Sequence, residues 1–410
     1  MINQIIFSFV RFICIRIAHN LKKQKTYTRA ILREYSLFMP DTKPDTRLLH
    51  ITSNKEEMYR TEDSIFIRLP PGRSVLSTSW INGGYQEDIS GVFNHQPPHH
   101  ASCSHSLEGG SVEAYMALVA ERLGFLPGKS AGLLTAANMK HAAIVVHSFR
   151  GVEVTAVVTA GIEVNGGRAG DPASYYQENG KTEMISGTIN TILLIGADLP
   201  AYSMTKAVIT ATEAKTAALQ ELMAQSRYSS GIATGSGTDS IAVIADTTHE
   251  KKLTDAGKHS KLGELIGKTV MEATKTALMQ QSELSAESQA DIMVRLNRFS
   301  ISEKELWSYA TRMNRENRKP AFIRSLQEIT KDPALLSGVA AIIHIMDEIS
   351  GGLLPETAGR DAARIYLRTM PELCGLIPDN ELISLLQDEC TVGELLQKTI
   401  AWIVKMRIPE

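Results

Sequence analysis

The distribution of β-branched residues along the chain constrains its fold most strongly. Short runs rich in valine, isoleucine and threonine occur between residues 64 and 280, and such runs predict strands. They cover Val75–Ser79, Ala142–Ser148, Val152–Thr159, Thr188–Ile195 and Ile241–Ala245. Between them, apolar residues recur at helical spacing in Val112–Leu123, Met204–Leu222 and Leu262–Leu278. Strands that alternate with helices in this way predict a layered fold of both element types.

Two of these runs lie on either side of Arg150 and Gly151, which predicts a hairpin. Glycine takes a positive φ at little cost, so it suits the tight turn. The sheet is therefore expected to contain antiparallel pairs. The predicted fold class is α/β (mixed α+β), with a mixed sheet packed against helices.

A chain of 410 residues is longer than one hydrophobic core usually supports. After residue 281 the β-like runs end and helical patterns dominate, at Ser302–Arg315, Ala321–Thr330, Ala334–Ile349, Glu356–Thr369 and Glu381–Met406, the last broken near Gly393. We therefore expect an extension over residues 1–60, an α/β domain over 61–280 and an all-helical C-terminal unit of unknown role over 281–410.

The net charge of the chain limits the class of its binding partner, and its cysteine content indicates its cellular compartment. With a formal net charge of −2, the chain has no positive electrostatic field that would hold a polyanion. We therefore expect a small molecule as its partner and no nucleic acid. Four scattered cysteines without a CxxC pair indicate a reducing compartment, the cytoplasm.

The apolar run Ile5–Ala18 is too short, and with Arg11 and Arg16 too charged, to span a bilayer. Its basic cluster follows it, whereas a secretory signal has basic residues first. Contact of residues 1–33 with a membrane surface stays open as an alternative.

Polar loops at the predicted strand ends are the candidate binding groups. They are rich in glycine, serine, threonine and asparagine, and they cover residues 77–85, 159–172 and 230–239. The last alternates glycines with hydroxyl residues but has no Lys after the glycines, so a phosphate loop of the Walker A type is not expected. A loop that binds an amide or an oxyanion through backbone N–H and hydroxyl donors fits the pattern.

Two loops carry titratable groups with two interpretations each. Arg168 and Asp171 are either functional or an ion pair that closes the loop. His259 and Glu264 are either a general base with its orienting carboxylate or a helix cap with an acidic first turn.

His95, His99, His100 and His105 lie close together around Cys103. Their spacing matches no standard zinc motif, so we expect neither a metal nor another cofactor.

Together these motifs resemble the adenosylcobinamide amidohydrolase family over residues 75–264. The resemblance rests on the order of several motifs: Leu76-Ser77-Thr78-Ser79 with Asn82-Gly83-Gly84, Asn94-His95, Gly132-Leu133-Leu134-Thr135, Val158-Thr159-Ala160-Gly161, Arg168-Ala169-Gly170-Asp171-Pro172, Gly187-Thr188-Ile189-Asn190-Thr191, Thr212-Glu213-Ala214-Lys215, Thr234-Gly235-Ser236-Gly237-Thr238-Asp239, and His259 with Lys261-Leu262-Gly263-Glu264. It implies hydrolysis of the amide that joins the aminopropanol arm to the corrin ring of adenosylcobinamide, which releases adenosylcobyric acid for cobalamin salvage. A corrinoid-binding protein without catalysis and an unrelated amidase are the alternatives.

An amide hydrolase has to activate a nucleophile, stabilise an oxyanion and protonate the leaving amine. In one route His259 or Asp171 activates water, while Asn82, Asn94 and amides near Ser236 and Thr238 hold the oxyanion. In the other, the hydroxyl of Thr238 or Ser79 attacks. The absence of a GxSxG motif argues against an α/β-hydrolase.

Glu213 and Lys215 lie two apart on a predicted helix, so only one of them is expected at the site, and Glu213 is the residue we choose. The expected catalytic residues are Asp171, His259, Thr238 and Asn82. Those expected to contact the substrate are Ser79, Asn94, His95, Arg168, Asn190, Glu213, Thr234, Ser236, Asp239 and Glu264.

Overall fold

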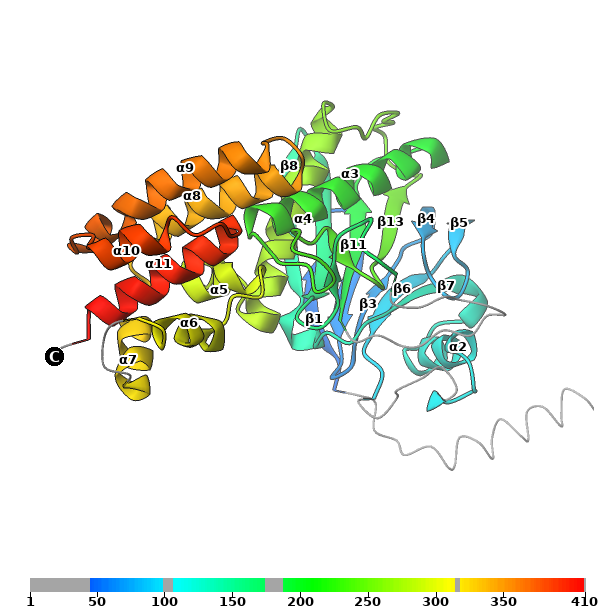
Figure 1. Cartoon of the computed structure of the whole chain (residues 1–410). Helices are drawn as coiled ribbons and strands as arrows, with labels where there is room; N and C mark the ends of the chain where they lie inside the picture. The colour runs from blue at the N-terminus through cyan, green and yellow to red at the C-terminus, as the bar shows by residue number, and fades with distance from the viewer. Residues whose placement is uncertain (1–44, 99–105, 174–186, 314–317, 409–410) are drawn as a thin grey trace, which may run out of the picture. The chain divides into compact units, whose positions relative to one another are not determined.

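The structure is a computed structural model that describes residues 45–98, 106–173, 187–313 and 318–408 (Figure 1). Residues 1–33, the histidines at 99, 100 and 105, and Cys103 lie outside the described residues, so the membrane-surface alternative and most of the histidine cluster do too. The chain divides into two compact units, residues 1–47 and 48–410. The elements below belong to the second unit, which begins within β1 (Arg47–Ile51).

A six-stranded mixed sheet forms the centre of the fold. Its order is β5 (Gly84–Glu87), β4 (Arg73–Ser77), β13 (Ser240–Asp246), β11 (Thr188–Ile195), β9 (Val152–Gly161) and β8 (Ala143–Phe149). β11 and β13 run parallel, and the other neighbours are antiparallel. The predicted fold class, a mixed sheet with antiparallel pairs and helices, is confirmed.

The predicted hairpin at Arg150 and Gly151 is confirmed as the turn between β8 and β9. Both residues have positive φ, 47° and 79°. Two consecutive residues with positive φ are typical of the tight turns whose twist matches that of the flanking strands. The ladder continues directly from this turn, with Phe149 opposite Val152.

A five-stranded sheet packs on one face of the central sheet. Its order is β1, β2 (Glu57–Arg60), β3 (Ser64–Arg68), β6 (Gly91–His95) and β7 (Ser130–Leu134). Alternate residues of β11 face different layers: Ile192 and Leu194 contact this sheet, whereas Leu193 and Ile195 face the helices. The strands of this second sheet were not predicted, because they are short and carry less regular β-branched patterns.

Helices cover both outer faces. α3 (Ala201–Glu221) and α4 (Lys261–Ser282) pack on the central sheet, and α2 (Val112–Arg122) packs on the five-stranded sheet (Figure 1). The buried stripe of α3 includes Ala207, Ala211, Ala214 and Ala218, and these small side chains bring the helix backbone close to its neighbours. Short elements complete this part of the chain, namely η2 (Pro127–Lys129), η3 (Met139–His141), β10 (Gly166–Gly167) and β12 (Gly235–Ser236).

The described residues after α4 are helical. The elements are α5 (Ile292–Asn297), α6 (Glu303–Ala310), α7 (Lys319–Ile329), α8 (Pro333–Ser350), α9 (Glu356–Thr369), η4 (Met370–Cys374), α10 (Asn380–Leu385) and α11 (Val392–Met406). They share a core of their own around Phe322 and Trp402.

The predicted break near Gly393 is confirmed between α10 and α11. The chain leaves the helix at Leu386 and re-enters it at Thr391, whose hydroxyl and the Glu394 carboxylate form a capping box, and Gly393 lies inside α11.

α8 is long and apolar enough to cross a membrane by length and composition alone, with a mean hydropathy of 1.3. Its buried residues Leu335, Val339, Ile342 and Ile343 form one stripe in the helical core. A core helix passes the same test, so this feature is weak evidence for a membrane span.

Candidate functional site

One edge of the central sheet collects the predicted polar loops. β11 and β13 begin at this edge, with Asn190 opposite Ser240, and the antiparallel β9 ends there, with Gly161 opposite Thr188. β4 also ends there, and Thr78 extends its ladder by donating its N–H to the carbonyl of Ile241 at 2.9 Å. Strand direction therefore brings together the loops that follow β4 and β9 and those that precede β11 and β13.

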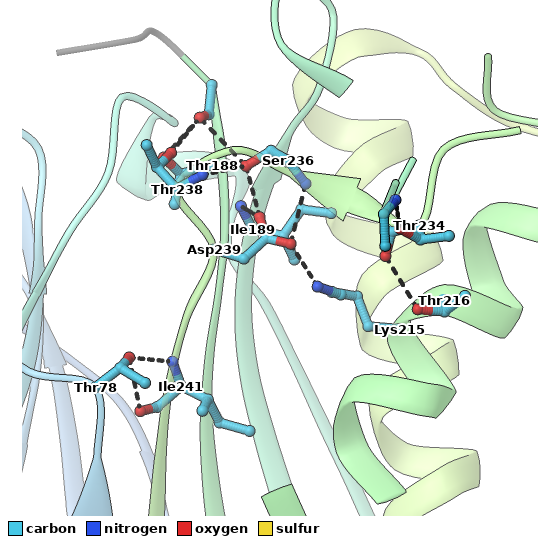
Figure 2. A network of polar contacts seen from close by, with 12 residues as sticks. Thr78, Thr188, Ile189, Lys215, Thr216, Thr234, Ser236, Thr238, Asp239 and Ile241 are labelled. Atoms are coloured by element: carbon cyan, nitrogen blue, oxygen red, sulfur yellow. Dashed lines mark hydrogen bonds and ion pairs between the residues drawn. The ribbon is translucent and has the colours of Figure 1, made fainter. Parts of the chain in front are cut away.

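Five residues at this edge form a polar network, called here the Asp239 cluster: Thr188, Lys215, Ser236, Thr238 and Asp239 (Figure 2). The two oxygens of Asp239 accept hydrogen bonds from the Ser236 hydroxyl (2.6 Å), the Ser236 N–H (3.0 Å), the N–H of residue 189 (2.9 Å) and the Lys215 ammonium. The side chains of Lys215 and Asp239 are only 13% and 16% exposed. The carboxylate thus fixes the turn 236–239 against β11 and α3.

Gly235 is required by this ion pair. A Cβ atom at Gly235 would lie 2.3 Å from an Asp239 oxygen and 2.8 Å from the Lys215 nitrogen. Both distances are shorter than a normal contact, so a side chain there would push the two charges apart. Gly235 therefore leaves the space that the side chains of Asp239 and Lys215 occupy.

Two hydroxyls form the other half of the cluster. The Thr238 hydroxyl lies 2.6 Å from that of Thr188 and 2.8 Å from the carbonyl oxygen of Gly187. The same carbonyl accepts a hydrogen bond from the Asn165 amide at 2.6 Å. Thr238 is half-buried, and its one hydroxyl hydrogen is shared between the Gly187 carbonyl and the Thr188 oxygen.

A buried chain of amides lies beside the cluster. The Asn94 amide donates to the Thr159 hydroxyl at 2.7 Å and accepts from the Asn190 amide at 2.8 Å. Asn190 lies two residues after Thr188 on β11, so both side chains face the same side of the sheet. The side-chain amide oxygen of Asn190 (Oδ1) is buried and has no hydrogen-bond partner in the described part of the chain. A buried acceptor of this kind calls for a water molecule or a ligand N–H group.

Asp171 and Arg168 lie in the turn that follows β10, and β10 pairs with β12 of the cluster loop. The Asp171 carboxylate accepts from the Ser226 hydroxyl at 2.5 Å and from the N–H of Arg168 at 2.8 Å. Burial raises the pKa of Asp171, but hydrogen bonds from Ser226, Ser229 and the Arg168 N–H outweigh it, so the pKa is lowered overall. Thr234 joins the turn to the cluster loop by accepting from the N–H of residue 169 at 2.9 Å.

These contacts bear on both interpretations of the Arg168-Asp171 pair. The guanidinium of Arg168 is exposed, and the carboxylate is held by hydroxyls and a backbone N–H group. A carboxylate with a lowered pKa is a weaker base, so its place in the fold suits loop closure better than proton abstraction.

Asn82 and Ser79 hold the loop after β4. The Asn82 amide donates to the carbonyls of Pro127 and Ser130 at 2.6 and 2.8 Å. The Ser79 hydroxyl accepts from the N–H of Gly132 at 2.7 Å and donates within its own loop. With both amide hydrogens of Asn82 engaged, the expected oxyanion donor is not available in this conformation.

His95 is a buried residue of the five-stranded sheet. Its ring nitrogens lie 2.8 Å from the Ser64 hydroxyl and 2.8 Å from the Tyr115 hydroxyl. Burial lowers the pKa of His95 to about 4, so the ring is neutral. At 3% exposure, His95 is not accessible to a substrate in this conformation.

His259 is exposed in the loop that leads to α4, and its role as a base stays a prediction. On one side of it, Lys258 pairs with Glu213 of α3 at 2.7 Å. On the other side, the Lys261 ammonium lies 4.8 Å from the ring centroid of Phe149, at the β8–β9 turn.

The residues expected to assist His259 are also engaged elsewhere. Glu264 pairs with Lys261 and, at 2.7 Å, with Lys268, and this holds the pKa of its carboxyl at about 2. The Glu264 carboxylate is therefore engaged by two lysines in this conformation, and its role as the partner of His259 stays a prediction. The alternative is observed, because Ser260 caps α4 by accepting from the N–H of Gly263 and Glu264 lies in the first turn. Glu213 faces solvent, where it pairs with Lys258 at 2.7 Å.

The sequence prediction missed Lys215 and Thr188. Both lie within motifs that the sequence singles out, and Lys215 is the partner that was set aside in favour of Glu213. In the described part of the chain, no group of three or more histidine, cysteine, aspartate or glutamate side chains could hold a metal ion.

Comparison with known proteins assigns a class and then a family. Residues 49–286, more than half of the chain, match the family model described as adenosylcobinamide amidohydrolase. The chain is thus a member of a group of amidohydrolases. It belongs to the adenosylcobinamide amidohydrolase family, which confirms the resemblance seen in the motifs and extends it to β1–β3.

Two similar proteins come from archaea. An uncharacterized protein of Methanocaldococcus jannaschii is 33% identical over 239 residues, which are 55% of this chain and 90% of that protein. A protein of Methanosarcina mazei named adenosylcobinamide amidohydrolase is 28% identical over 211 residues, 50% of this chain and 89% of that protein. A crystal structure of a Pyrococcus horikoshii protein aligns with a TM-score of 0.30 and 13% identity over 58% of this chain and 83% of that one, which does not establish a common fold.

Proposed function

We propose that this protein hydrolyses the amide bond between the aminopropanol arm and the corrin ring of adenosylcobinamide in the cytoplasm. Water adds to the amide carbonyl, the C–N bond breaks, and adenosylcobyric acid and aminopropanol are released for cobalamin salvage. Family membership over residues 49–286 supports the reaction type. The observation that carries the proposal at the level of the site is the Asp239 cluster, which gathers five of the motif residues at one sheet edge.

Asp239 and Lys215 act in this proposal as positioning residues. The Asp239 oxygens already accept four hydrogen bonds, which fill most of their lone-pair positions. A carboxylate that is held in this way orients its neighbours and is a poor proton acceptor. Its effect is to fix the Ser236 hydroxyl and the N–H groups of the turn.

Thr238 is our candidate for direct contact with the reacting amide. Its hydroxyl contacts the Gly187 carbonyl and the Thr188 hydroxyl in this conformation, and in the proposal it turns toward the substrate, where it acts either as a donor to the oxyanion or as the attacking group. Lone hydroxyls are weak nucleophiles without a base. The described cluster places no histidine beside Thr238, so we assign Thr238 as a donor and water as the nucleophile, which itself requires a base from outside the Asp239 cluster.

The direct test incubates the purified full chain with adenosylcobinamide and follows released aminopropanol and adenosylcobyric acid by mass spectrometry. We expect both products in equal amounts. Thr238→Val should lose most of the activity, whereas the matched control Thr205→Val, which removes an exposed hydroxyl of α3, should keep it. Corrinoid binding without either product would instead indicate a binding protein, and neither binding nor product would reject the proposal.

A further inference from the structure

A cavity of about 220 Å³ opens beside the end of α3, outside the Asp239 cluster. Part of its wall follows β9 and α3, including Ile162 and Arg227. The rest comes from residues beyond α4, including Gln289, Arg295 and Arg298. A more open hollow of about 530 Å³ shares Arg227 and Arg298 with it. The cavity is thus built by both the family-matched part of the chain and the helices that follow it.

Three guanidinium groups line this cavity, and only one of them has a carboxylate partner. Arg298, whose side chain is 6% exposed, pairs with both oxygens of Asp347 at 2.6 Å. Arg295 donates through Nε to the carbonyl of Gln289 at 2.8 Å. Within the ranges that the structure describes, neither Arg295 nor Arg227 forms an ion pair with a carboxylate.

The local charge balance favours an anion. Burial and, next, the charge of Arg298 lower the pKa of Arg295, but a guanidinium stays charged at neutral pH. Glu163 is the acidic side chain of the wall, and Asp347 neutralises Arg298. Three cations against two carboxylates leave one excess positive charge. Arg227 is exposed to solvent, whereas Arg295 is half-buried without a carboxylate partner among the described residues, and an anion would compensate its charge.

We propose that this cavity binds the phosphate group of a small phosphorylated ligand. The planar guanidinium presents paired N–H donors that match phosphate oxygens. The volume of about 220 Å³ exceeds the roughly 30 Å³ of one water molecule several times, which leaves room for a phosphate with part of its organic group. Ile162, Leu284 and Ile343 provide apolar surface for that group.

The cavity is linked to the candidate site by a short path. Arg227 donates its N–H to the carbonyl of Gly166 at 2.8 Å, and Gly166 pairs with Ser236 of the Asp239 cluster. The phosphate therefore belongs either to a separate phosphorylated ligand or to the arm of a corrinoid whose amide lies at the cluster. The second source, but not the first, rests on the proposed function.

The test measures inorganic phosphate binding to the full chain by calorimetry at low salt. We expect Arg295→Gln and Arg227→Gln each to weaken binding by roughly 10-fold or more, the loss typical of one charge-assisted hydrogen-bonding partner. The matched control Arg324→Gln removes an exposed arginine of α7 and should bind as the unmodified chain does. Absence of phosphate binding to the unmodified chain, or equal binding by all four proteins, overturns the proposal.

Two further measurements separate the sources of phosphate. If the phosphate lies on the substrate, Arg295→Gln raises the KM for a corrinoid with a phosphorylated arm and leaves that for adenosylcobinamide unchanged. If it lies on a separate ligand, inorganic phosphate still binds to the Arg295-containing cavity, and the phosphorylated corrinoid does not compete with it. Phosphate binding without any hydrolysis of corrinoids would reject the proposed function and leave the cavity proposal standing.

Discussion

Replacing Lys215 with methionine removes the cation of the Asp239 cluster while keeping most of the side-chain volume. The two side chains are 13% and 16% exposed, so the pair lies between a surface and a buried ion pair. Breaking a fully buried pair from one side costs about 3–5 kcal/mol, and an exposed pair contributes about 0–1 kcal/mol. Because Asp239 keeps its hydrogen bonds from Ser236 and residue 189, we expect Lys215→Met to lower the free energy of unfolding by about 1–3 kcal/mol.

The measurement is urea unfolding of the full chain, with Asp239→Asn and the double variant completing a thermodynamic cycle. Residues in direct contact should show a coupling free energy of about 1 kcal/mol or more. Lys258→Met serves as the matched control, since its ion pair with Glu213 is 62% and 50% exposed and should contribute about 0–1 kcal/mol.

The same variant should also lower kcat, because the turn 236–239 would lose the group that fixes it. Additive effects of the two single changes would refute the reasoning that Lys215 and Asp239 act as a pair. Unchanged kcat together with lost stability would show that the cluster is structural only.

Two other predictions concern histidines, His259 and His95. His259→Ala should keep kcat close to that of the unmodified chain, measured as aminopropanol release, because His259 is exposed in the loop before α4 and forms no hydrogen bond with the Asp239 cluster in the described part of the chain. A loss of 100-fold or more, the size expected for a general base, would support it as the catalytic base. The pKa of His95 is lowered from 6.5 to about 4, so protonation is disfavoured in the folded state. Above pH 6.5 His95 is neutral in both the folded and the unfolded chain, so the folded state keeps its full stability. As pH falls toward 4, the unfolded chain binds a proton that the folded chain does not, and the free energy of unfolding falls by about 3 kcal/mol in all. His95→Gln should therefore flatten the fall in unfolding free energy between pH 6.5 and 4.5, and equal slopes would contradict this.

The sequence predicted the central sheet well where strands are long and apolar. β11 is buried along its whole length, so Thr188–Ile195 was predicted with its observed bounds. β1 and β2 have half-exposed, mixed residues and were missed, since short strands without regular alternation carry little signal. The helix Glu356–Thr369 was predicted with its observed bounds from its apolar helical pattern.

The candidate site was predicted less completely, because a motif identifies residues but not where their side chains point. Glu213 and Lys215 are two apart on α3 and face different directions, and only the buried stripe of Ala207, Ala211 and Ala218 decides which one turns toward β13. For His259 the sequence offered a cap interpretation beside the catalytic one, and the structure shows Ser260 capping α4 with Glu264 in its first turn.

The parallel pairing of β11 with β13 has a consequence for how the chain acquires its site. The two strands are joined through α3, and Thr188, Lys215 and Asp239 come from the start, the middle and the end of this one unit. Lys215 and Asp239 are separated by 24 residues, whereas the contacts of Thr188 with Thr238 and of residue 189 with Asp239 each close a loop of 50 residues, which is slow to form relative to a hairpin. A nascent chain that has not yet added β13 therefore lacks both the centre of its sheet and the complete Asp239 cluster.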